Sequence, residues 1–180
     1  MKNILIISTS LRKDSNSEVL ADEFAKGANE AGNAVESINL TDKNIGFCRG
    51  CLACQKTHKC VIRDDMIELA EKAKNADVLV FATPIYYYGM SGQMKTLLDR
   101  CNPIFGSDYR FREIYLLATA TDEDESAMDG AVTGLKGWIS CFGKAELTKV
   151  ICGTGVSDSD EMKSHPELCQ TAYQAGLKIK

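Results

Sequence analysis

Cysteine is unevenly spread along this chain of 180 residues, which contains eight of them. Four lie between positions 48 and 60: Cys48, Cys51, Cys54 and Cys60. The N-terminus has no signal peptide pattern, so a reducing cytoplasmic compartment is expected. In such a compartment, a group of cysteines is more typical of a local chemical site than of a disulfide framework. The other four stand among apolar neighbours and are expected to be small buried hydrophobic residues: Cys101, Cys141, Cys152 and Cys169.

A second candidate segment, residues 8–17, is dense in hydroxyl groups, carries Arg12 and Lys13, and runs directly into a predicted helix. Backbone N–H groups at a helix N-terminus, supported by Ser and Asn side chains and an Arg, suit a phosphate dianion. The Walker A and Gly-x-Gly-x-x-Gly motifs are both absent, which favours a mononucleotide over a dinucleotide. An ordinary capped helix after a polar loop would carry similar residues.

A third candidate segment, residues 82–95, contains three successive tyrosines, Tyr86, Tyr87 and Tyr88, just beyond a predicted strand. Three neighbouring rings cannot all point into one core, so some are expected at the sheet edge, where an aromatic ligand could stack on them. Pro84 restricts the backbone and Gly89 frees it for a tight wrap around such a ligand. The alternative is a tyrosine-rich packing patch under the next helix.

Short apolar runs alternate with segments of helical periodicity, and no repeat is present. Five runs rich in apolar or β-branched residues are predicted strands: 3–8, 34–39, 77–82, 113–119 and 145–152. Predicted helices span 15–31, 91–101 and 126–142, with another capped by Asp64 and Asp65 and a last one opened by Pro166.

This alternation predicts an α/β fold with helices on both faces of a doubly wound parallel sheet. Five strands in a single domain of residues 1–180 favour the flavodoxin-like order 2-1-3-4-5. Ligands of such sheets bind beyond the C-terminal ends of the strands. The loop after the second strand is unusually long, and its cysteine-rich part spans 46–63.

Charge and hydropathy exclude other classes. The chain has 21 Lys plus Arg against 25 Asp plus Glu, a net charge of -4, which argues against nucleic acid as a partner. The longest apolar runs are far shorter than the about 20 residues that cross a bilayer, so no membrane association is expected. The N-terminal apolar run is too short for a signal peptide, and a cytoplasmic location is expected.

The motif Ser-x-Arg-x-x-Ser-Asn-Ser after the first strand, with Thr-Pro-Ile-Tyr-Tyr-Tyr-Gly-Met-Ser-Gly-Gln-Met-Lys after the third, resembles the flavodoxin-like NAD(P)H-dependent FMN reductase superfamily. The resemblance covers nearly the whole chain. It implies an FMN phosphate site at Ser10, Arg12, Ser15, Asn16 and Ser17. It implies that the isoalloxazine ring lies against Thr83, Pro84, Ile85, Tyr86, Tyr87, Tyr88 and Gly89, with Thr119, Ala120 and Thr121 closing over it. Thr9, Leu11 and Ser15 depart from the Gly, Pro and Gly of many relatives, which affects the expected loop path more than the ligand.

The run from Cys48 to Cys60 resembles that of the iron-sulfur flavoproteins within this superfamily, which implies a [4Fe-4S] cluster on Cys48, Cys51, Cys54 and Cys60. A Cys-x2-Cys-x2-Cys run with a fourth thiolate nearby is compatible with such a cluster. Zinc, which usually takes two separated pairs of ligands, and no metal at all are the alternatives. Basic residues of this loop could balance a cluster's charge or meet the phosphates of a nicotinamide nucleotide: Arg49, Lys56, Lys59 and Arg63.

Two functions follow from the resemblance. The first is an enzyme that passes electrons from NAD(P)H through FMN to a small-molecule or protein acceptor, with no side chain required as acid or base. The second is an electron carrier that relays electrons between FMN, a [4Fe-4S] cluster and partners such as ferredoxin. A homodimer or homotetramer is expected, because the tyrosine and cysteine loops would leave an apolar face for a second subunit.

Overall fold

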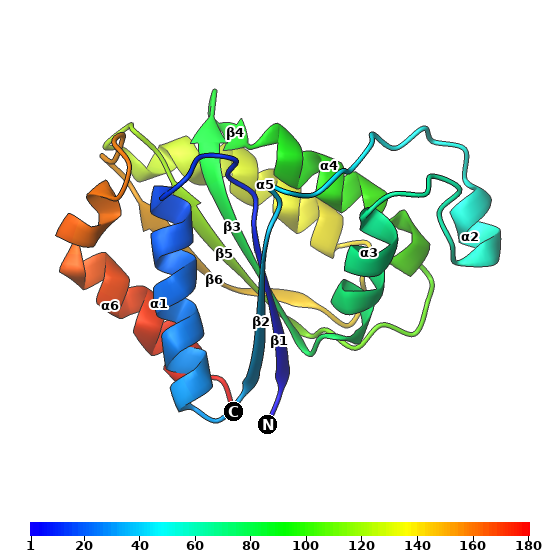
Figure 1. The fold of residues 1–180 in the computed structure, drawn as a ribbon, viewed down its shortest axis with the longest axis horizontal. Helices are drawn as coiled ribbons and strands as arrows, with labels where there is room; N and C mark the ends of the chain where they lie inside the picture. Colours follow the sequence, from blue (N-terminus) through cyan, green and yellow to red (C-terminus); the bar gives the residue numbers. More distant parts are fainter.

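The computed structural model describes residues 1–180 and contains a six-stranded sheet (Figure 1). Five parallel strands lie in the order β2-β1-β3-β5-β6, which is the predicted order once the short β4 is set aside. Their bounds are β1 Asn3–Ser8, β2 Ala34–Asn39, β3 Val78–Tyr86, β5 Glu113–Thr119 and β6 Glu146–Gly153.

The sixth strand corrects the prediction of five. The third strand does not end at residue 82: β3 continues to Tyr86, turns, and pairs antiparallel with β4 (Gly89–Met90). Pro84 lies within β3 beside Thr119 of β5. The reason is the tight turn after Tyr86, which brings the chain back onto β3 in place of an open loop.

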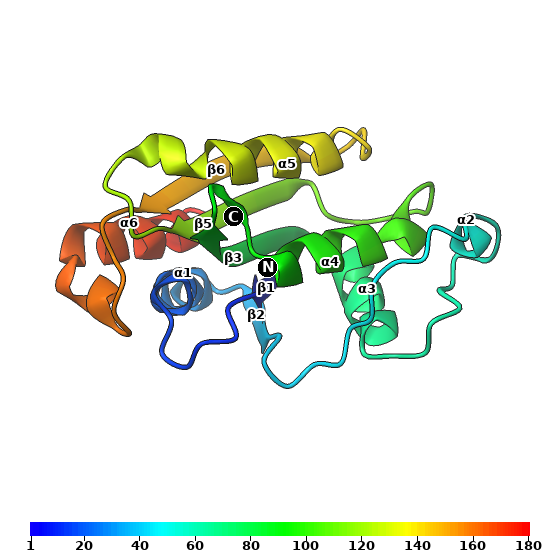
Figure 2. The same cartoon turned by 90° about the horizontal axis from the view of Figure 1, so that it is seen from above.

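Helices cover both faces of the sheet (Figure 2). One face carries α1 (Asn16–Glu30) and α6 (Pro166–Leu177). The other carries α3 (Met66–Asn75), α4 (Gly92–Arg100) and α5 (Asp129–Ile139), and α2 (Ala53–Thr57) lies far out on the cysteine loop. Three 3-10 helices complete the chain: η1 Asn102–Ile104, η2 Glu125–Met128 and η3 Glu161–Ser164. No helix is both long and apolar enough to cross a membrane.

Side chains of each buried strand alternate between two cores. In β1, Leu5 and Ile7 pack with α3, α4 and α5, whereas Ile4 and Ile6 pack with α1 and α6. A parallel strand covered on both faces must be apolar at every position, which explains the continuous apolar run in the sequence. Two layers of buried apolar side chains therefore fix the strand ends, where the candidate residues lie.

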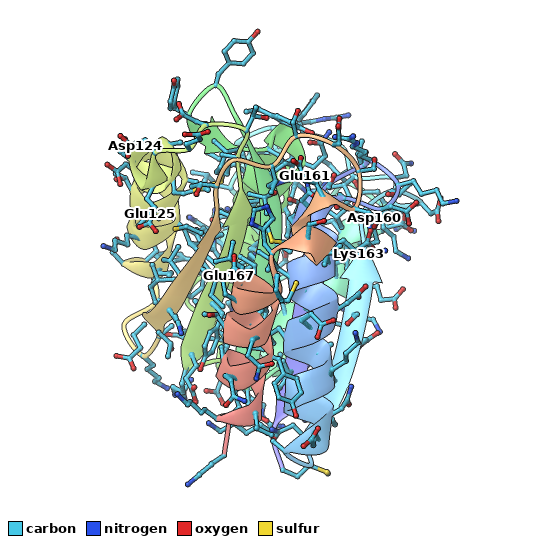
Figure 3. The ribbon with its side chains drawn as sticks, turned by 90° about the vertical axis from the view of Figure 1, so that its left-hand side faces the viewer. Asp124, Glu125, Asp160, Glu161, Lys163 and Glu167 are labelled. Atoms are coloured by element: carbon cyan, nitrogen blue, oxygen red, sulfur yellow. The ribbon has the colours of Figure 1, made fainter.

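The helices α1 and α6 pack side by side at close range (Figure 3). A Cβ on Gly176 would lie 2.1 Å from the carbonyl oxygen of Phe24, and one on Gly27 would lie 2.0 Å from that of Tyr173. Glycine is needed at these positions because the two backbones touch. This contact sets the position of α1, whose N-terminus is part of the candidate site.

One smaller expectation is wrong, and another holds in part. Cys141 is exposed, because it follows the last turn of α5 on the solvent side, while Cys101 is buried and Cys152 and Cys169 are partly buried. Asp65 is the N-cap residue of α3, but its carboxylate accepts a hydrogen bond from the Asn44 N–H at 2.6 Å and does not cap the helix. The neighbouring Asp64 accepts from the Met66 N–H at 3.2 Å.

Candidate functional site

The loop between β1 and α1 presents a row of free backbone donors. From Ser10 to Ser17, the Arg12 N–H alone donates a hydrogen bond within the protein, to the Ser10 Oγ at 3.2 Å. The Ser15 side chain caps α1 by accepting from the Glu18 N–H at 3.3 Å. Residues 11–14 of this row are exposed, whereas Ser10 and residues 15–17 are buried, where N–H groups without partners are rare. The N–H groups of residues 15–17 lie at the positive end of a fifteen-residue helix. The loop can therefore hold an anion.

The predicted phosphate-binding residues fall into two groups. Ser10, Ser15 and Ser17 are buried in the loop around these donors. The exposed Arg12 lies against the segment after β6, with its Nε donating to Ser159 Oγ at 2.9 Å and its Nη1 to the Ser157 carbonyl at 2.5 Å. The structure thus gathers the serines and directs the guanidinium toward residues 157–159.

Asn16 also contacts this segment. Its Nδ2 donates to the Asp158 carbonyl at 2.9 Å, and its Oδ1 accepts from the Met162 N–H at 3.0 Å. Figure 3 shows Asp160, Glu161 and Lys163 over the N-terminal end of α1. Residues 157–162 therefore form a wall of the site that the sequence reasoning missed. The nearest sequence signal for this wall is the glycine pair Gly153 and Gly155, just before it in the chain. Such a pair is too common to identify a site by itself.

A buried network of hydroxyl groups joins the loop after β1 to the loop after β3. Thr9 Oγ1 lies 3.0 Å from Ser91 Oγ and donates to the Ala82 carbonyl at 3.0 Å. Thr83 Oγ1 lies 3.2 Å from the same Ser91 oxygen, which also caps α4 by accepting from the Met94 N–H at 3.2 Å. The network fixes the two loops relative to each other without using the tyrosines.

The tyrosine hairpin is exposed and strained. Tyr86, Tyr87 and Tyr88 are all exposed, and Tyr87 is fully so. Tyr87 and Tyr88 have φ of 49° and 60°, the left-handed region that a type I′ hairpin turn requires and that Asn-Gly normally occupies. Bulky residues held there cost free energy and are typical of ligand-binding segments. Figure 1 shows the turn projecting at the top of the sheet.

Two contacts hold this hairpin in place. The Tyr88 hydroxyl donates to the Asp122 carboxylate at 3.1 Å, and this acceptor raises the pKa of Tyr88. A Cβ on Gly130 in α5 would lie 2.1 Å from the Tyr88 carbonyl oxygen, so the hairpin backbone rests directly on that helix. The hairpin is thus supported from the loop after β5 and from α5.

The loop after β5 reaches the same edge of the sheet. Thr119 and Ala120 are both buried. The Ala120 N–H donates to the Gly153 carbonyl at 2.9 Å, and its carbonyl accepts from the Val156 N–H at 3.0 Å. Thr121 is exposed beyond them. The loops after β1, β3, β5 and β6 therefore meet at the C-terminal edge of the sheet, and a cavity of about 330 Å³ opens beside them between Leu11, Leu40 and Gly92.

The four clustered cysteines lie away from this edge, on the loop that carries α2 (Figure 1). Cys54 is buried, and its Sγ accepts from the Asn102 Nδ2 at 3.1 Å. Cys60 is partly buried, and its Sγ lies 3.5 Å from the Arg100 Nη2. Cys48 and Cys51 are exposed, and no three metal-binding side chains converge. Two of the four sulfur atoms are thus fixed against the end of α4 and the start of η1.

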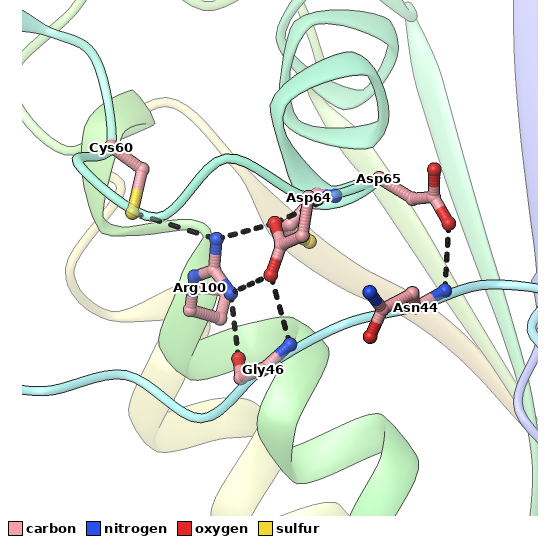
Figure 4. Close-up of polar contacts among 7 residues, drawn as sticks. Asn44, Gly46, Cys60, Asp64, Asp65 and Arg100 are labelled. Atoms are coloured by element: carbon pink, nitrogen blue, oxygen red, sulfur yellow. Dashed lines mark hydrogen bonds and ion pairs between the residues drawn. The ribbon is translucent and has the colours of Figure 1, made fainter.

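An ion pair closes the stem of this loop (Figure 4). The Arg100 and Asp64 side chains are only 1% and 4% exposed and form two bonds of 2.7 and 2.8 Å. Asp64 also accepts from the Gly46 N–H at 2.9 Å, while Arg100 donates to the Gly46 carbonyl at 2.6 Å. Arg100 holds the pKa of Asp64 below its ordinary value. Arg100 thus pairs with a carboxylate 36 residues away along the chain.

Comparison with known proteins identifies relatives. Over 101 residues the chain is 38% identical to an iron-sulfur flavoprotein of Methanocaldococcus jannaschii, a match that covers 56% of this chain and 52% of the relative. An iron-sulfur flavoprotein of Archaeoglobus fulgidus is 39% identical over 108 residues, 60% of this chain and 55% of the relative. The chain thus spans about half the length of the curated relatives it matches.

The whole fold also has a counterpart among solved structures. An NAD(P)H:quinone oxidoreductase from Methanothermobacter marburgensis superimposes with a TM-score of 0.77 at 17% identity, covering 99% of this chain and 96% of the other. This likeness confirms the flavodoxin-like α/β fold. The family model for NADPH-dependent FMN reductase matches residues 2–150, which include the loops after β1, β3 and β5. The chain therefore belongs to the NADPH-dependent FMN reductase family.

Proposed function

We propose that this protein is an oxidoreductase that binds FMN at the edge formed by the loops after β1, β3 and β5 and passes electrons from NAD(P)H to an acceptor. The observation that carries the proposal is the row of free N–H groups between Ser10 and Ser17 at the start of α1. Such a row is suited to a phosphate dianion. Family membership supports flavin mononucleotide as the ligand whose phosphate binds there.

The chain's own residues would position the cofactor. Ser10, Ser15 and Ser17 add hydroxyl donors around the free N–H groups, and Arg12 supplies a cation from the rim. The exposed rings and backbone of Tyr86 to Gly89 offer a surface for a flat aromatic ring. Because the Tyr88 hydroxyl is tied to Asp122 and its pKa is raised, this phenol stays protonated near neutral pH.

Bound FMN would supply the redox chemistry, since it takes a hydride from a nicotinamide nucleotide and hands electrons on. No side chain is needed as a general acid or base. The protein would bind the phosphate, orient the ring and leave one face open to both substrates in turn. The acceptor is proposed to be a small molecule or a protein.

A Ser15→Asp variant tests the phosphate site. Aspartate caps a helix as well as serine does and favours its N-terminus electrostatically, so α1 should be retained. The added carboxylate should repel a phosphate, and FMN affinity should fall about tenfold or more, since one charge-assisted bond is worth about 1.5 to 3 kcal/mol. Riboflavin, which has no phosphate, is the matched control and should bind about equally to both proteins. Equal losses for both ligands, or no loss for FMN, would remove the phosphate from this loop.

A second candidate function is an iron-sulfur flavoprotein that relays electrons through a cluster in the cysteine loop. It is supported by two hydrogen bonds: Asn102 donates to the Cys54 sulfur and Arg100 donates to the Cys60 sulfur. Such bonds stabilise thiolate sulfur. The names of the relatives also favour it. The four thiols fit in type and number, and loading would require the exposed Cys48 and Cys51 to approach the other two.

Anaerobic reconstitution with iron and sulfide tests this second function. A cluster predicts about four irons per chain and broad absorption beneath the flavin bands. Cys54→Ser should lose that absorption and keep FMN, because the flavin loops lie on other elements. Cys101→Ser, at a buried cysteine outside the loop, is the matched control and should keep both. A parent with full FMN and no iron would defeat the cluster and leave the FMN oxidoreductase standing.

The oligomeric state and location also belong to this proposal. A homodimer or homotetramer would cover the exposed tyrosine hairpin, and the protein is proposed to act in the cytoplasm. Sedimentation at micromolar concentration tests the first statement, since a monomer mass would contradict it.

A further inference from the structure

A second cavity lies on the side of the molecule that carries α3, away from the proposed flavin site. Its volume is about 440 Å³, within the range of small-molecule sites. It opens between α3, the cysteine loop and the segment around η1, and it shares no lining residue with the loops after β1, β3 or β5. Nothing in the proposed FMN chemistry uses it.

The floor of this cavity is apolar. Met66 and Ile104 are almost fully buried beneath it, and Ala70 and Pro103 continue the surface. Ile67 stands at the rim with 47% of its surface exposed, one of the few large hydrophobic side chains left open to solvent. The floor offers no side-chain hydrogen bond for a ribose or a sugar, so it favours a ligand with an apolar body.

The rim of the cavity is basic. Lys59 and Arg63 are exposed and form no ion pair, and Lys74 has one carboxylate, Glu71, at 3.8 Å. The whole chain has a net charge of -4, so this local excess of positive charge is unlike the rest of the surface. Glu71 also lines the cavity, and the cations still outnumber this carboxylate. An excess of cations around an apolar floor is complementary to an organic anion.

One wall of the cavity is formed by a buried arginine. Arg100 lines the cavity, and its Nε is the one buried side-chain polar atom of the protein without a hydrogen-bond partner. Both Nη atoms are occupied by Asp64, Gly46 and Cys60. The unpaired Nε costs free energy, but it is buried, so the acid group of a ligand is expected at the exposed rim cations and not beside this atom.

We propose that this cavity binds a small amphipathic organic acid, with a flat apolar body on Met66 and Ile104 and a carboxylate or sulfonate facing Arg63, Lys59 and Lys74. An inorganic anion would leave the apolar floor unused. A bound acid would contact Cys60 as well as α3. It would therefore hold the cysteine loop against the body of the protein, and this site is independent of the flavin site.

The test uses 1-anilinonaphthalene-8-sulfonate as the probe and FMN-loaded protein, so that the flavin site is filled. We expect one probe bound per chain, measured by calorimetry. The uncharged N-phenyl-1-naphthylamine should bind about tenfold more weakly or worse, which is about 1.4 kcal/mol. Equal binding of the two probes would show a merely apolar groove, and no binding of the sulfonate would remove the site; both results overturn the proposal.

Variants locate the binding. Arg63→Glu places a carboxylate at the rim, and Ile67→Glu does so at the exposed apolar edge; neither residue forms a side-chain hydrogen bond, so both variants should fold. Each should weaken the sulfonate about tenfold or more. Lys56→Glu is the matched control, because it makes the same charge change on α2 outside the cavity, and it should leave affinity within about twofold of the parent. Equal effects of Arg63→Glu and Lys56→Glu would show general charge attraction and overturn the site.

Discussion

Replacing Asp64 by Asn should cost the protein a large part of its stability. The variant keeps the shape of the side chain but leaves the Arg100 guanidinium, 1% exposed, without a counter-charge. Asp64 accepts bonds from both Arg100 Nη atoms and from the Gly46 and Met66 N–H groups, and an amide oxygen cannot serve all four. Removing one partner of a buried ion pair costs about 3 to 5 kcal/mol. The whole free energy of unfolding of a domain is about 5 to 15 kcal/mol.

Urea unfolding followed through Trp138 measures this loss. This single tryptophan packs on Phe81, Phe111 and Phe142 in the core, so its fluorescence reports the global transition. Asp99→Asn is the matched control, because it breaks the exposed Lys95–Asp99 pair on the same helix and should cost less than about 1 kcal/mol.

A double variant separates the charge from the packing. Arg100→Met with Asp64→Leu removes both charges, and it should recover much of the stability that Asp64→Asn loses, since apolar replacement of a whole buried pair is often neutral. If Asp64→Asn lowers the free energy of unfolding no more than Asp99→Asn does, the Arg100–Asp64 pair does not stabilise the stem of the cysteine loop, and the prediction is wrong.

The remaining predictions concern acid stability, helix packing, the hairpin and the flavin phosphate. Arg100 lowers the folded-state pKa of Asp64, so the contribution of ionised Asp64 to stability is fully present above its unfolded pKa of about 3.9 and disappears as pH falls through the folded value. Below about pH 4, the free energy of unfolding of the parent should therefore fall more steeply than that of Asp64→Asn, as acid titrations would measure. Gly176→Ala places a Cβ 2.1 Å from a carbonyl oxygen of α1, and denaturant unfolding should show a loss of about 1 to 3 kcal/mol. Replacing Tyr87 and Tyr88 by Asn and Gly should raise the free energy of unfolding by about 1 kcal/mol, because those residues suit positive φ, while FMN titration shows weaker binding. Arg12→Ala should raise the Kd for FMN about tenfold, and an unchanged Kd would remove this guanidinium from the site.

The central strands were predictable because β1, β3 and β5 are buried on both faces, whereas the edge strand β2 is largely exposed. Strands β1 and β5 have the predicted bounds, since an apolar run that ends at polar residues marks where burial stops. Strand β2 also has the predicted bounds, although it lies at the sheet edge and has no buried residue. Helix α1 is also close to its prediction, because Ser15 caps its start and Gly32 follows its end. Each of these signals is local and lies within one segment.

What the sequence did not show depends on contacts between distant segments. The β3–β4 hairpin was missed because Tyr-Tyr is an unusual pair for a turn with positive φ. The wall at residues 157–162 was missed because Asn16 and Arg12 reach it across 142 to 147 positions. The partner of Arg100 lies 36 residues away, and no spacing rule connects two such positions.

Helix α4 connects the two candidate centres of the molecule. Its N-cap, Ser91, belongs to the hydroxyl network that joins the loops after β1 and β3. At its other end Arg100 contacts Cys60, and Asn102 of the following η1 contacts Cys54. A helix of nine residues is about 14 Å long. Because both of its ends are anchored by buried hydrogen bonds, α4 fixes the separation of the flavin loops from the cysteine loop within one chain. A change at Arg100 should therefore act on the cysteine loop and leave the flavin loops in place, since their network does not include it.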